Sequence, residues 1–119
     1  MVRNSRMITM NEYQAKCGAT VTYRGPSGIE HSLENIEYCT LGLCGEAGEI
    51  ANKVKKLYRD GDTKERREAI TLEIGDVLWY TAMLAYELQV LLGDCAEENL
   101  TKLMARKFKG TIHGDGDHR

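Results

Sequence analysis

The spacing of apolar and polar residues predicts four helices joined by short breaks, with no alternation typical of strands. Thr9 followed by Glu12 has the pattern of a capping box, which places a first helix over about 10–23. The stretch around Pro26 is the clearest loop signal, and a second helix is expected over about 32–58. A third helix is expected over about 64–92 and a fourth over about 95–108. We therefore predict an all-α protein, a bundle of four principal helices.

The third helix differs from the others because apolar residues surround it from Ile70 to Leu92. A helix with this pattern is covered on several sides, either by other helices or by a second subunit. A chain of 119 residues also buries a modest share of its surface when it folds alone. We expect the bundle to be completed by oligomerisation.

Three glycines recur at every third position of the second helix: Gly42, Gly45 and Gly48. Glycine weakens a helix by about 1 kcal/mol relative to alanine. Two explanations fit the pattern. Another backbone or a ligand approaches the helix closely there, or the helix is kinked or broken.

Charge and composition narrow the class of protein. The formal net charge is −2, so nucleic acid is not expected as a partner. No apolar run approaches the ~20 residues of a membrane span, and no apolar signal region follows the first residues. The four cysteines form no CxxC pair, which argues against a zinc site or a disulfide framework. These features predict a cytoplasmic protein with no membrane partner and reduced cysteines.

Two pairs of carboxylates carry the strongest chemical signal. Glu46 and Glu49 lie three residues apart on the second helix, and Glu73 and Asp76 lie three apart on the third. This spacing puts both acids of a pair on one helix face. The 23 residues between the pairs suit a helical hairpin that sets them opposite each other. Converging carboxylates repel one another unless a cation lies between them, and Mg²⁺ prefers oxygen ligands.

The alternative is that these acids are ordinary surface residues that pair with lysines on the same helix. Glu49 and Lys53 have the spacing of a surface ion pair on a helix. Glu73 and Asp76, in contrast, lie in the most apolar helix, with no lysine or arginine local to them. Buried acids need a partner, so the pattern favours a metal site over a set of surface acids.

Basic and amide residues suggest where phosphates would bind. Lys53 shares the helix face of the first acid pair, where it would neutralise the acids or contact a phosphate. Asn99, Lys102 and Arg106 form one stripe on the fourth helix. An amide with two cations in line suits a polyphosphate, although solvated helix faces often have the same pattern.

Three further residues allow a role in base recognition. Trp79 follows Asp76 by three residues, where it would stack on a base or fill the core. Tyr13 and Gln14 on the first helix would read a base edge or serve in packing. The sequence leaves these alternatives open.

The order Glu46-x-x-Glu49 followed by Glu73-x-x-Asp76 resembles the ExxE…ExxD signature of the MazG-like all-α nucleoside triphosphate pyrophosphohydrolases. The resemblance covers nearly the whole chain. Other similar stretches are Asn11-Glu-Tyr-Gln14, Leu43-Cys-Gly-Glu-Ala-Gly-Glu49, Glu73-Ile-Gly-Asp-Val-Leu-Trp-Tyr80, Asn99-x-x-Lys102-x-x-x-Arg106 and the end of the chain from Gly110 to Arg119.

This resemblance implies hydrolysis of a (deoxy)nucleoside triphosphate to the monophosphate and pyrophosphate. It also implies Mg²⁺ as cofactor, with Mn²⁺ as a substitute, and a homodimer or homotetramer. One MazG-like helical domain would span 1–119, with 109–119 as a glycine-rich tail. By motif match, the metal ligands would be Glu46, Glu49, Glu73 and Asp76, and the substrate contacts would be Lys53, Asn99, Lys102 and Arg106.

The chemistry of that reaction is compatible with the acids. Attack of water on a phosphorus atom needs the water activated and the phosphate charge neutralised, and carboxylate-held metal provides both. Glu46 or Glu49 would orient or deprotonate the water. Two other classes remain: a module that binds nucleotides or a protein with little or no turnover, and a helical interaction module in which the acids have no chemical role.

Overall fold

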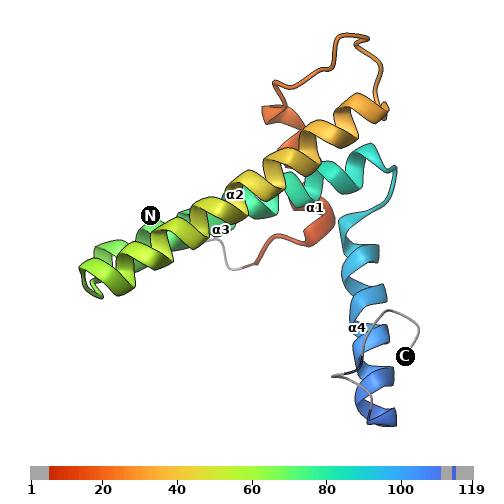
Figure 1. Cartoon of the computed structure of the whole chain (residues 1–119). Coiled ribbons are helices and arrows are strands. Elements are labelled where there is room, and N and C mark those ends of the chain that lie inside the picture. Colours follow the sequence, from red (N-terminus) through yellow and green to blue (C-terminus); the bar gives the residue numbers. More distant parts are fainter. Residues whose placement is uncertain (1–5, 111–113, 115–119) are drawn as a thin grey trace.

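The computed structural model describes residues 6–110 and 114 (Figure 1). Its elements are α1 (Met10–Cys17), the short 3-10 helix η1 (Gly18–Thr20), α2 (Leu33–Asp60), α3 (Lys64–Glu87) and α4 (Leu92–Lys109). The described residues contain no strand, so the predicted all-α class with four principal helices is confirmed. Among these residues, no helix combines the length and apolar character needed to cross a membrane.

A long antiparallel hairpin of α2 and α3 forms the centre of the molecule (Figure 1). Gly61, with φ of 117°, ends α2, and the hydroxyl of Thr63 caps α3 by accepting the Arg66 N–H at 3.2 Å. The short turn between them is the one the sequence predicts, and it sets the two helices side by side.

Helix α2 runs unbroken through its three glycines, so the alternative of a break is wrong. A Cβ atom on Gly42 would overlap the ring of Tyr80 on α3, whereas one on Gly45 or Gly48 would meet nothing within 4 Å. Close approach therefore explains Gly42, where the partner is a side chain of the neighbouring helix.

The first helix ends at Cys17, and the predicted end near residue 23 is wrong. After η1 the chain continues as an irregular segment, 21–32, that is held by the buried carboxylate of Glu87. This carboxylate accepts hydrogen bonds from the Tyr23 hydroxyl at 2.7 Å, the His31 backbone N–H at 2.9 Å and the Asn35 side chain at 3.2 Å. A buried acid requires such donors. The hydrogen bonds to Glu87 therefore hold residues 21–32 in an irregular path instead of a longer first helix.

The break between the last two helices also differs from the prediction. Helix α3 ends at Glu87 rather than near 92, and α4 begins at Leu92 rather than at 95. No side chain of the local sequence caps α4. Instead Gln14 on α1 accepts the Leu92 N–H at 3.0 Å, and Asn11 accepts the Gly93 N–H at 2.8 Å. The start of α4 is therefore set by residues about 80 positions away, which local sequence patterns do not reveal.

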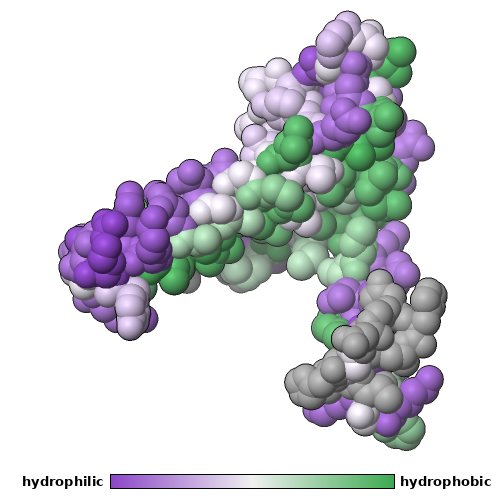
Figure 2. Space-filling model, viewed as in Figure 1, coloured by the Kyte–Doolittle hydropathy of each residue, from purple (hydrophilic) through white to green (hydrophobic). Residues whose placement is uncertain are grey.

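Helix α4 extends away from the hairpin, so the chain has an open shape (Figure 1). The radius of gyration is 17.3 Å, compared with about 13.5 Å for a compact domain of this length. Many large apolar side chains are exposed, among them Leu72 on α3 and Leu41 on α2. Figure 2 shows apolar surface along the hairpin and around the junction with α4.

Candidate metal centre

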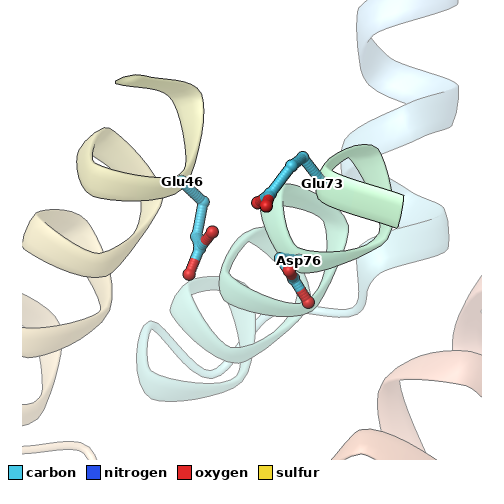
Figure 3. A group of neighbouring side chains, drawn as sticks. All are labelled: Glu46, Glu73 and Asp76. Atoms are coloured by element: carbon cyan, nitrogen blue, oxygen red, sulfur yellow. The ribbon is translucent and has the colours of Figure 1, made fainter. Parts of the chain in front are cut away.

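Three carboxylates from the two arms of the hairpin converge at one place (Figure 3). Glu46 comes from α2, and Glu73 and Asp76 come from α3. One carboxylate oxygen from each lies within 4.8 Å of the others. The i, i+3 spacing on α3 places its two acids on one face, and the hairpin brings that face to α2.

Glu49 lies outside this group of three. Its side chain is exposed on α2, and its role as a metal ligand or as the base that activates water remains a prediction. Its negative charge still contributes to raising the pKa of Glu46, so the two carboxylates lie within electrostatic range.

The centre holds more negative than positive charge. The pKa of Glu46 is raised, chiefly by its hydrogen bond with Glu73, then by burial and by the neighbouring carboxylates. Lys53 lies on the same face of α2, as predicted, and its Nζ is 3.3 Å from Glu73 Oε1. Within the described residues this ion pair supplies one cation for three acids, and it crosses the hairpin rather than joining Lys53 to Glu49.

The second oxygen of Glu73 distinguishes this centre from an ordinary ion-pair network. The Glu73 side chain is 16% exposed, and its Oε2 is buried with no hydrogen-bond partner. A buried carboxylate oxygen without a donor is unfavourable unless a ligand supplies the missing positive charge. An all-oxygen set of carboxylates fits a hard divalent cation such as Mg²⁺.

A pocket of about 340 Å³ opens beside the acids, lined by Thr20, Glu46, Asp76, Trp79 and Tyr80. The indole Nε1 of Trp79 donates a hydrogen bond to Thr20 Oγ1 at 2.8 Å. Trp79 also packs against the core, which fits one of the two predicted alternatives, and stacking on a base remains a prediction. Thr20 was not anticipated as a site residue, because the sequence placed it inside a longer first helix.

The polar stripe predicted on the fourth helix does not lie beside the acids. Asn99 is exposed, Lys102 is half-buried and Arg106 is buried at 5% exposure. None of the three lines the pocket beside the acids, and α4 extends away from the hairpin (Figure 1). Their predicted contact with substrate therefore remains a prediction, and a single chain does not bring them to the acids.

Gln14 and Tyr13, the two residues of the first helix considered for base recognition, differ in their surroundings. The buried amide of Gln14 donates to the carbonyl oxygens of Ala82 and Val90 and accepts the Leu92 N–H. These bonds occupy both ends of the amide, so Gln14 serves packing rather than base recognition. The pKa of Tyr13 is raised to about 12 by burial, by Cys17 and by the negative charge of Asp76. Tyr13 therefore lies within electrostatic range of the acids.

Comparisons with known proteins agree with this geometry. The sequence model of the MazG nucleotide pyrophosphohydrolase domain matches residues 34–110, which include all three converging acids. The chain is also similar to the Gene 37 protein of Mycobacterium phage L5, with 48% identity over 110 residues, 90% of this chain and 96% of that protein. No solved structure matches the chain. The chain therefore belongs to the MazG nucleotide pyrophosphohydrolase family.

Proposed function

We propose that the protein hydrolyses (deoxy)nucleoside triphosphates to the monophosphate and pyrophosphate, and thereby controls nucleotide pools in the cytoplasm. Mg²⁺ would be the cofactor, with Mn²⁺ as a substitute. The observation that carries the proposal is the convergence of Glu46, Glu73 and Asp76 within 4.8 Å beside a pocket, with Lys53 as the neighbouring cation.

Each acid of the centre, and Lys53, has a proposed role in the reaction. Glu46, Glu73 and Asp76 would hold the cation, and Glu49 would complete the set from the adjacent turn of α2. Bound Mg²⁺ neutralises phosphate oxygens and lowers the pKa of a bound water. Glu46 or Glu49 would orient that water and accept its proton. Lys53, which pairs with Glu73, would neutralise the acids or contact a phosphate.

We also propose that the working form is a homodimer or homotetramer built from single-domain chains spanning 1–119. A compact protein of 13.4 kDa exposes about 6,500 Å², whereas this chain exposes 9063 Å². The difference is of the size that obligate subunit interfaces bury. An assembly would cover the exposed apolar side chains of the hairpin. It would also allow Asn99, Lys102 and Arg106 to reach the acids of a neighbouring subunit.

One alternative has support of its own. The extent of exposed apolar surface (Figure 2) is also what a protein-interaction module with little turnover would present. The buried, unpartnered oxygen of Glu73 favours the enzyme, because an interaction module has no need of a cation centre.

The deciding experiment measures pyrophosphate released from each nucleoside triphosphate and deoxynucleoside triphosphate, with Mg²⁺ or with EDTA. Release that depends on Mg²⁺ supports the proposal. Release that persists in EDTA, or no release from any triphosphate, contradicts it. The assembly is measured separately by sedimentation velocity, where a monomer at micromolar concentration would contradict the proposed oligomer.

A further inference from the structure

The start of α4 is built differently from the starts of the other helices. Thr9, Ser32 and Thr63 precede α1, α2 and α3, and the hydroxyl of each accepts a backbone N–H of the helix that follows it. Leu91, which precedes α4, has no such group. The first N–H groups of α4 are bonded instead by side chains of α1. The direction in which α4 leaves the hairpin (Figure 1) is therefore fixed by a different helix.

Gln14 holds the connection between α3 and α4 on two sides. Its side-chain nitrogen donates to the carbonyl oxygens of Val90 at 3.0 Å and Ala82 at 3.2 Å, and its oxygen accepts the Leu92 N–H at 3.0 Å. The connection turns at Gln89, whose φ of 61° lies in the left-handed region that usually holds glycine at the end of a helix. One buried amide therefore joins α1, the end of α3 and the start of α4.

Asn11 makes the matching contact one residue further along α4. Its Oδ1 accepts the Gly93 N–H at 2.8 Å. A Cβ atom on Gly93 would lie 2.8 Å from this oxygen, so the contact requires glycine on α4. Asn11 and Gln14 are three residues apart and share one face of α1. That face forms the seat on which α4 begins.

The seat determines where the far end of α4 lies. Helix α4 has 18 residues, and Arg106 follows Leu92 by 14 positions, or about 21 Å along the axis. A tilt of about 10° at Leu92 would move Arg106 by about 4 Å on this length. A shift of that size separates a hydrogen-bonded pair completely. The position of the stripe formed by Asn99, Lys102 and Arg106 therefore depends on the contacts at the start of α4.

We propose that Asn11 and Gln14 are positioning residues, which aim α4 so that its stripe meets the phosphates of a substrate held at the acids of a neighbouring subunit. The inference rests on the proposed function and adds the residues that set the reach from one subunit to the next. Charge favours this destination, because Lys102 and Arg106 would bring positive charge to a cluster of three carboxylates.

Amide hydrogen exchange tests the seat without any assay of activity. Asn11→Ala removes the acceptor of the Gly93 N–H, whereas Asn11→Asp keeps an oxygen there and adds a charge that a helix N-terminus favours. We expect the Gly93 amide to exchange about tenfold faster in Asn11→Ala and at the wild-type rate in Asn11→Asp. Equal protection in all three proteins would contradict the role of Asn11, and an unprotected Leu92 amide in wild type would contradict that of Gln14.

Steady-state kinetics test the consequence for the substrate. Asn11 is suited to this because it is exposed, whereas removal of the buried Gln14 amide would leave unpaired groups in the interior. Asn11→Ala should raise KM for the triphosphate about tenfold and leave kcat unchanged, because the acids stay in place and the lost contacts bind substrate and transition state alike. Asn11→Asp should keep the wild-type KM. A lower kcat with an unchanged KM would contradict the inference.

Gly93→Ala disturbs the same contact from the side of α4. The new methyl group displaces the Asn11 side chain, although alanine favours a helix over glycine. We expect KM to rise as in Asn11→Ala, while urea denaturation shows no loss of stability. A role in stability alone predicts an unchanged KM for this variant, and that result would overturn the inference.

A mixed assembly tests whether α4 acts on the neighbouring subunit. Asn11→Ala subunits are co-purified with an excess of Glu73→Gln subunits, which lack one acid but carry a correctly aimed α4. The intact acids of each Asn11→Ala subunit then meet such a helix, so KM should return to the wild-type value. A KM that stays raised would overturn the inference. If wild type releases no pyrophosphate from any triphosphate, the proposed function fails, and the exchange measurement still decides whether α1 holds α4.

Discussion

Glu73 and Glu87 lie on the same helix, 14 residues or about four turns apart, and their surroundings differ in one respect. Glu87 is 1% exposed and accepts hydrogen bonds from three donors. Glu73 has one oxygen beside Lys53, while its other oxygen is buried without a partner. A carboxylate with saturated bonding stabilises the fold, whereas one with an unfilled position is available to a ligand.

The largest expected effect is on catalysis at Glu73. Glu73→Gln keeps the shape of the side chain but removes a charge that would bind the cation, so we expect kcat to fall by on the order of 10²–10³-fold. The substitution reduces repulsion among the acids and so does not destabilise the fold. The helical CD signal should therefore be unchanged. Glu68→Gln, on the same helix and exposed, is the matched control and should keep wild-type activity. Full activity in Glu73→Gln would refute the assigned role.

The second effect is on stability at Glu87. Glu87→Ala leaves Tyr23, His31 and Asn35 without their common acceptor, which should lower the free energy of unfolding by about 3 kcal/mol. Urea denaturation followed by CD measures this change. Glu87→Gln, which retains one acceptor oxygen, should lose less. If Glu87→Ala is as stable as wild type, the three hydrogen bonds do not anchor segment 21–32.

The third expected effect is on thermal stabilisation by Mg²⁺, which should differ between variants of Glu73 and Glu87. A cation that binds the folded centre and not the unfolded chain raises stability, by about 2.7 kcal/mol when Mg²⁺ is present at 100 times its Kd. Thermal melts should therefore shift upward with Mg²⁺ in wild type and in Glu87→Gln. The shift should be smaller in Glu73→Gln. An equal shift in all three proteins would mean that Mg²⁺ binds elsewhere.

The smallest expected effect is on how the free energy of unfolding depends on pH. Because the folded state raises the pKa of Glu46, it binds a proton more tightly than the unfolded state does. Without metal, stability should therefore decrease as pH rises from the ordinary value of 4.5 through the raised folded value, and should level off above it. Glu46→Gln should remove this slope, as measured by urea denaturation in EDTA across pH 4–8. A slope that persists in Glu46→Gln would assign it to another group.

Much of the fold was predictable from local patterns. The hairpin turn carries its own signals, with Gly61 ending α2 and Thr63 capping α3, and the acid spacing placed Glu73 and Asp76 on one face. The first break and the last break were misplaced because their determinants are not local. The carboxylate of Glu87 holds segment 21–32, and the side chains of Asn11 and Gln14 cap α4.

The candidate site was predictable to a similar extent. Convergence of four acids beside Lys53 was expected from spacing, since side chains three or four apart share a helix face, and three of the four, without Glu49, form the group. The pairing of Lys53 with Glu73 was not expected, because it crosses the hairpin. Thr20 was missed altogether, since its position beside Trp79 follows from where the first helix ends.

The sequence by itself determined the helical class, the hairpin and the identity of the acids, because helix periodicity and turn chemistry act over a few residues. The tertiary structure decided which acids meet and which oxygen lacks a partner. Those properties depend on burial and on contacts between residues distant in the chain, which no local spacing encodes. Glu73 and Glu87 are the same residue type on one helix, and their surroundings alone distinguish them.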